Sequence, residues 1–192
     1  MIEAAIRFLM TNYTISFFFA GLVGASRKIW RHRQKLSHGF IAEAFFSYYC
    51  FFSLGVCFVY NFVMHVFFHG MAARFIGWSD SPFQLEVGFA SLGLGLAGLL
   101  AIRKELWLRV GVIIISNTFL WGAAGGHLYQ LFENHDFAPG NAGVMLWTGL
   151  LQPVISVALL VWSIRTEKAI SRPVEHQYDI YLWQQELTKE HH

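Results

Sequence analysis

Four side chains that can bind a metal or transfer a proton are expected at one depth of this chain, although they come from three separate segments. His65 and His69 are four residues apart in one apolar run, Glu86 lies near the start of a second run, and His127 lies near the end of a third. Histidine nitrogens and a carboxylate oxygen suit zinc, iron or copper, and histidines at positions i and i+4 share one helix face. The pattern therefore predicts a divalent metal site.

The same side chains permit two other interpretations. Histidine titrates near neutral pH and a carboxyl group in apolar surroundings can keep its proton, so the set can relay protons. Alternatively, polar groups near a membrane interface only cap helices, form hydrogen bonds between helices and contact water. The sequence leaves the choice open. Four further polar residues are expected to support the site: Asn61, Gln84, Gln130 and Asn141.

The elements that must position these side chains are membrane-spanning helices. The chain has 192 residues, of which 55% are hydrophobic and 14% charged, so it lacks the polar residues needed to cover a soluble domain. Apolar runs near the ~20 residues that cross a hydrocarbon core occur at about residues 6–25, 40–69, 82–101, 107–132 and 143–164. We predict an all-α transmembrane bundle of five spans.

This bundle is expected to form a single domain over residues 1–172, followed by a tail. The tail, residues 173–192, mixes aromatic and charged residues and can form a short amphipathic helix on the inner membrane surface or contact a partner.

Cationic residues indicate the orientation. Lysine and arginine gather in the first connection (27–35), in the third (103–109) and after the fifth run (165–172), whereas the second connection has only Arg74 and the fourth has none. Connections rich in these residues stay in the cytoplasm. We therefore predict an amino terminus outside, a carboxyl terminus inside and a candidate site that faces outward. Glu43 is expected to pair with a cation of the basic first connection.

Two local patterns concern the helices themselves. The sequence SPFQ predicts a helix start, with Ser81 as the N-cap, Pro82 at the first helical position and Gln84 reaching back to the cap. Cys50 and Cys57 are seven residues apart, about 10 Å along a helix axis, which is too far for a disulfide. We expect both cysteines to fill apolar space.

Small residues predict how two of the helices pack. Ser91 and Gly95 are four residues apart in the third run, and Gly122 and Gly126 are four apart in the fourth. Small residues at this spacing allow helix backbones to approach closely in lipid. The third and fourth helices are therefore expected to contact each other through these stripes.

One motif resembles a known family. The pattern IGW-x-x-SPFQ-x-EVG, followed by GAAGGHLYQLFENHDFAPGNAG, is similar to a group of small, multi-spanning bacterial inner-membrane proteins of unknown function, over about residues 60–160. The resemblance implies a location in the bacterial inner membrane and no assigned activity. The matching pattern positions are Trp78, Pro82, Gln84, Glu86, His127, Gly140 and Asn141.

Two classes of function remain open from the sequence. One is a metal or proton site at the outer end of the bundle. The other is a non-catalytic membrane subunit or scaffold that binds lipid, quinone or a partner protein. A small transporter is a third possibility, and five helices would then need to oligomerise. Besides the bilayer, the expected partners are a second copy or another membrane protein, and no nucleic acid is expected.

Overall fold

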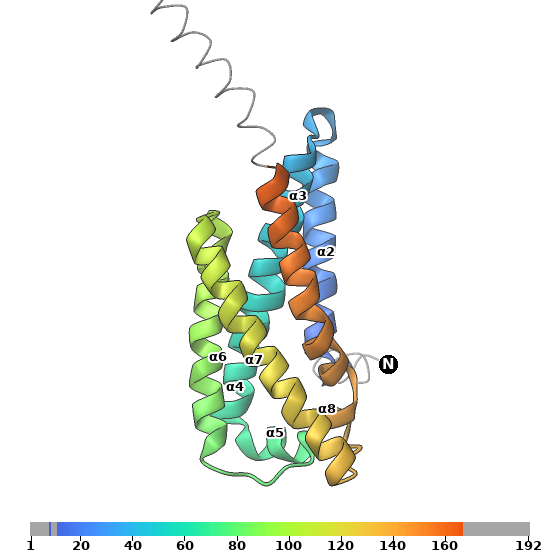
Figure 1. Ribbon diagram of the computed structural model, residues 1–192, viewed down its shortest axis with the longest axis vertical. Helices are drawn as coiled ribbons and strands as arrows, with labels where there is room; N and C mark the ends of the chain where they lie inside the picture. The colour runs from blue at the N-terminus through green and yellow to red at the C-terminus, as the bar shows by residue number, and fades with distance from the viewer. Residues whose placement is uncertain (1–7, 9–10, 167–192) are drawn as a thin grey trace, which may run out of the picture.

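The structure is a computed structural model that describes residue 8 and residues 11–166, and all of the regular elements in these residues are helical (Figure 1). The all-α class is therefore confirmed for this part of the chain. The tail at 173–192 lies outside the described residues. In chain order the elements are α2 (Tyr13–Arg31), η1 (Arg33–Lys35), α3 (His38–Tyr48), η2 (Tyr49–Val56), α4 (Cys57–Phe67), α5 (His69–Ile76), α6 (Phe83–Leu100), η3 (Ala101–Arg103), α7 (Leu106–Glu133), α8 (Pro139–Ala142) and a last helix at 144–166.

Four helical segments are long and apolar enough to cross a membrane. They are His38–Phe67, Phe83–Arg103, Leu106–Glu133 and Pro139–Thr166. Each overlaps one of the predicted runs with ends that differ by a few residues. The remaining run, at 6–25, corresponds to α2, which is not among the four candidate spans of the described residues.

The long helices lie roughly side by side (Figure 1). Helix α2 packs along α3 and η2, α6 packs along η2 and α4, and α7 crosses obliquely in front of them. The short helices α5 and α8 lie together at one end of the bundle, close to the ends of α4 and α7. The opposite end carries η1, η3 and the end of the last helix.

The small-residue stripe of α6 contacts α4 and η2. A Cβ atom at Gly95 would lie 2.9 Å from the Val59 nitrogen, and one at Gly98 would lie 2.7 Å from the Gly55 nitrogen. Ser91 is fully buried on the same face. The expected contact with the stripe of α7 is not formed, because a Cβ at Gly122 would have nothing within 4 Å and one at Gly126 would meet only Trp78.

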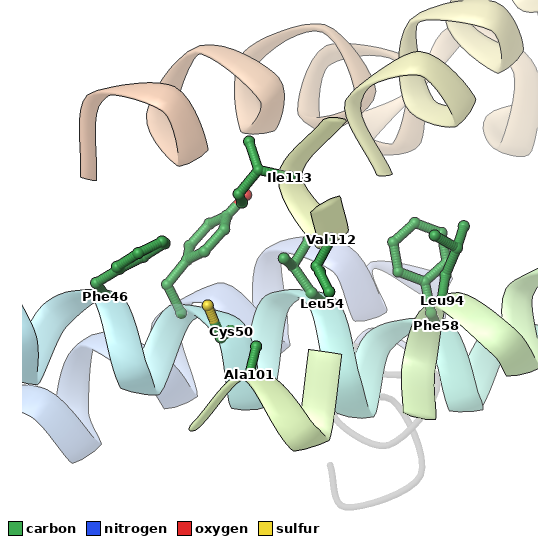
Figure 2. Close-up of a cluster of buried hydrophobic side chains, with 9 residues drawn as sticks. Phe46, Cys50, Leu54, Phe58, Leu94, Ala101, Val112 and Ile113 are labelled. Carbon is green, nitrogen blue, oxygen red and sulfur yellow. The ribbon is translucent and has the colours of Figure 1, made fainter. Parts of the chain in front are cut away.

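The apolar core lies where η2, α4, α6 and α7 meet (Figure 2). Cys50 and Cys57 are free and buried, as the sequence predicted, and Cys50 belongs to this core. The core residues are Phe46, Tyr49, Cys50, Leu54, Phe58, Leu94, Ala101, Val112 and Ile113.

A buried ion pair closes the end of the bundle that carries η3. The Arg109 guanidinium donates to both Glu43 carboxylate oxygens at 2.8 and 2.9 Å, and its Nε donates to the Ala101 carbonyl at 2.9 Å. Ser47 also accepts from Arg109, and the guanidinium lies 4.7 Å from the centre of the Phe46 ring. Among the described side chains, the ion-pair partners of Glu43 are therefore Arg109 of α7 and, at 3.7 Å, Lys104 of the third connection, and not a cation of the first connection.

Candidate functional site

A cavity of about 530 Å³ lies at the α5 and α8 half of the bundle, among α2, η2, α4, α6, α7 and the last helix. Most of its wall is apolar or glycine, and no aspartate, glutamate, lysine or arginine of the described residues lines it. A volume of this size suits a small organic ligand. Its hydrogen-bonding side chains include Tyr13, Ser53, Asn61, His65, Trp78, Gln84, His127 and Gln152.

His127 is held by an amide whose orientation is fixed. The Asn141 nitrogen donates to the backbone carbonyls of Asp136 and His127, at 2.9 and 3.2 Å. The Asn141 oxygen is therefore the atom that lies 2.7 Å from His127 Nδ1 and accepts its proton. In neutral His127 the other ring nitrogen, Nε2, then carries a lone pair and can accept a hydrogen bond from a ligand.

His65 has a similar arrangement on α4. This buried side chain forms a hydrogen bond between Nδ1 and the Gln84 carbonyl oxygen. Gln84 therefore does not reach back to cap α6, whose start has no side-chain capping bond. The expected capping box is not formed, because the Gln84 side chain is used to orient His65.

Trp78 contributes an aromatic wall and a hydrogen-bond donor. Its ring lies against the His127 ring, with centroids 5.0 Å apart and planes 33° apart. The indole nitrogen is buried and has no hydrogen-bond partner among the described residues. Gly77 ends α5 with a φ of 89°, a left-handed conformation that favours glycine and turns the chain so that Trp78 follows.

A chain of hydrogen bonds lies deeper in the wall. The Tyr13 hydroxyl donates to the Asn61 oxygen at 2.9 Å, the Asn61 nitrogen donates to Ser91 Oγ at 2.8 Å, and Ser91 donates to the Val87 carbonyl. Asn61 thus connects α2, α4 and α6 by hydrogen bonds. A polar side chain within an apolar run already suggests such a bond between helices. The contribution of Tyr13 could not be predicted from the sequence, because Asn61, which accepts its hydrogen bond, is 48 residues away.

The structure brings His65 and His127 to one cavity but places the other two candidate ligands elsewhere. His69 is exposed and its Nδ1 lies 2.8 Å from Asp80, because α4 ends at Phe67 and the i, i+4 relation to His65 is lost. Glu86 is exposed, since residues two apart on a helix point to different faces and Gln84 faces the cavity.

This placement leaves the described residues without a group of three or more His, Cys, Asp or Glu side chains that could hold a metal ion. Gln130 also lies apart from the cavity, and its side-chain oxygen accepts a hydrogen bond from Asn134.

The exposed residues of the cavity wall show where it opens. Phe83 of α6 is 62% exposed, and Thr118, Gly122 and Ala123 of α7 are exposed as well. These residues belong to the two facing helices α6 and α7, both long enough to span a membrane. The exposed part of the lining therefore lies on α6 and α7, where Gly122 adds no side chain, and we take it as the lateral mouth of the cavity.

Comparison with known proteins identifies a family and no activity. The family of unknown function DUF6790 matches residues 11–169, so the chain belongs to that family. No curated protein and no solved structure matches the chain significantly.

Proposed function

We propose that this protein is a membrane-embedded binding protein for a neutral, lipid-soluble organic molecule with a hydroxyl-bearing aromatic head. The observation that carries the proposal is the end of the cavity near α5 and α8, called its outer end below, where His65 and His127 can each offer an acceptor nitrogen and the Trp78 N–H has no partner among the described residues. A phenolic hydroxyl fits this set, because it can donate its one hydrogen bond to a histidine nitrogen and accept another from the Trp78 N–H.

The side chains that line the cavity favour a neutral ligand over a charged one. A charged ligand in an apolar cavity is costly unless an opposite charge compensates it. No aspartate, glutamate, lysine or arginine from residues 11–166 lines this cavity. The aromatic rings of Trp78 and His127 give a planar head a surface on which to stack.

The lateral mouth supports a route from the bilayer. A lipid-soluble molecule can pass between α6 and α7 without crossing a polar surface, because the mouth residues are Phe83, Gly122, Ala123 and a threonine. The Thr118 hydroxyl donates a hydrogen bond to the Ile114 carbonyl, so this threonine presents little polarity to the ligand.

For the topology we propose five spans in a bacterial inner membrane, with α2 as the first and the amino terminus outside. Support comes from α2 packing along η2 and from the basic residues of α2, η3 and the last helix, which gather at one end of the bundle (Figure 1). Cysteines introduced at Ser79 and Phe137 are expected to react with an impermeant maleimide in intact cells, and one at Gln34 only after lysis. The opposite pattern would invert the model.

The binding proposal predicts a selective effect at Trp78. Trp78→Phe keeps an aromatic ring and removes the N–H, so binding of tritiated para-decylphenol in nanodiscs should weaken about three- to tenfold. Folding should be retained, because the lost donor has no protein partner among the described residues. His127→Leu should reduce binding further, since it removes the acceptor nitrogen and the stacked ring.

The matched controls are Trp147→Phe and His38→Leu, which change exposed residues outside the cavity. Both should bind the probe as the wild type does. Equal binding by wild type, Trp78→Phe and His127→Leu, or no binding by any of them, would remove the proposal.

A further inference from the structure

Ser53 is a buried hydroxyl that the described part of the chain leaves without a partner. It is 1% exposed, and its Oγ has no hydrogen-bond partner among the described residues. Other hydroxyls of the bundle, such as those of Ser91 and Thr148, donate to the carbonyl four residues earlier. A buried polar group left unsatisfied costs stability, so an unpartnered one in a native fold calls for an explanation.

The position of Ser53 links it to the cavity. Ser53 lines the large cavity and also a second one of about 80 Å³, which lies between α2, η2 and the last helix and is otherwise lined by apolar residues and Tyr49. Ser53 also belongs to η2, a π-helix set between α3 and α4. Short π-helical segments are rare and occur frequently at functional sites.

One hydrogen bond connects residues that line the two cavities. The Tyr49 hydroxyl donates to the Gln152 backbone carbonyl at 3.0 Å, and these two residues line the small and the large cavity respectively. Ser53 is thus the unsatisfied polar group at the inner end of the large cavity, as Trp78 is at the outer end.

The distance between Ser53 and the His65 end of the cavity limits the shape of a ligand that forms hydrogen bonds at both. Ser53 and His65 are twelve residues apart along one continuous helical segment, which corresponds to about 18 Å at the α-helical rise. Building on the proposed function, we infer that the ligand is an elongated amphiphile with polar groups at both ends. Its aromatic hydroxyl binds at His65, His127 and Trp78, and an oxygen at the end of its apolar chain accepts a hydrogen bond from Ser53.

Two probes with the same head and the same number of chain carbons test this inference. Para-decylphenol carries the head and the chain, and its ω-hydroxy derivative adds an oxygen at the end of the chain. In nanodiscs of phosphatidylcholine and phosphatidylglycerol, at the same probe-to-lipid ratio, the wild type should bind the ω-hydroxy probe about three- to tenfold more tightly. Ser53→Ala should remove this difference, so that the variant binds the two probes with equal affinity.

The controls separate binding from folding. Ser53→Ala should be at least as stable as the wild type, because it deletes a hydroxyl without a partner, and Ser26→Ala, at an exposed serine of α2, should keep the preference for the ω-hydroxy probe. If both probes bind equally to the wild type, or if Ser53→Ala keeps the preference, the second anchor is refuted while the proposed function stands. If neither probe binds, the proposed function itself fails.

Discussion

Replacing Glu43 by leucine is expected to destabilise the protein by about 3–5 kcal/mol, because it leaves a permanently charged guanidinium buried without its counter-ion. Arg109 is 3% exposed and cannot release its proton at accessible pH, so it cannot escape the cost by becoming neutral. Arg109→Met should cost less, since Glu43 retains Lys104 at 3.7 Å and can take up a proton.

The double variant decides between a charge effect and a packing effect. Glu43→Leu with Arg109→Met removes both charges together, and buried pairs replaced by apolar residues are often neutral or even stabilising. Unfolding in mixed micelles by titration with dodecyl sulfate should therefore show the double variant recovering most of the loss. Lys104→Met is the matched control, because this lysine is 60% exposed and should contribute less than about 1 kcal/mol. A double variant as unstable as Glu43→Leu would contradict this account.

Gly98→Ala is expected to cost about 1–3 kcal/mol, the range for an overpacked core. The added Cβ would lie 2.7 Å from the nitrogen and 3.0 Å from the Cα of Gly55, which are backbone atoms of η2 and cannot rotate away. The contact of α6 with η2 must then open, and this contact helps to position both Ser53 and the core around Leu54.

Gly93→Ala is the matched control on the same helix, and its expected effect on stability is opposite to that of Gly98→Ala. A Cβ at Gly93 would have nothing within 4 Å, and alanine favours a helix over glycine by up to about 1 kcal/mol. Gly93→Ala should therefore be neutral or stabilising when Gly98→Ala is destabilising, in the same micelle titration. Equal effects at both positions would show that close approach to Gly55 is not what requires glycine.

The helical class and the positions of four long helices could be predicted because both follow from local composition. Each of these helices coincides with an apolar run, and the two cysteines are buried as a run of that kind implies. Ion pairing of Glu43 could also be anticipated from local composition, since a carboxylate near the end of an apolar helix needs a cation. Its partner could not be identified, because Arg109 is 66 residues away.

The candidate site was predicted only in part, for three physical reasons. The chain turns after Phe67, so the regular spacing that relates His65 to His69 does not continue. Gln84 bonds to His65 instead of capping its own helix, and Glu86, two residues further on, lies on a different face and is exposed. The π-helix η2 has more residues per turn than an α-helix, so it changes which face Ser53 lies on. A sequence pattern based on 3.6 residues per turn does not detect this change.

The lateral mouth has a thermodynamic consequence for selectivity. Under the proposed function, a molecule that enters between α6 and α7 comes from the bilayer and has already left water. Its apolar middle then exchanges contacts with hydrocarbon tails for contacts with side chains of equal polarity. The hydrophobic effect then adds almost nothing to affinity, although partition into the bilayer raises the local concentration of every lipophilic competitor. Discrimination must then come from the polar ends of the proposed ligand, which bind at His65, His127 and Trp78 and at Ser53.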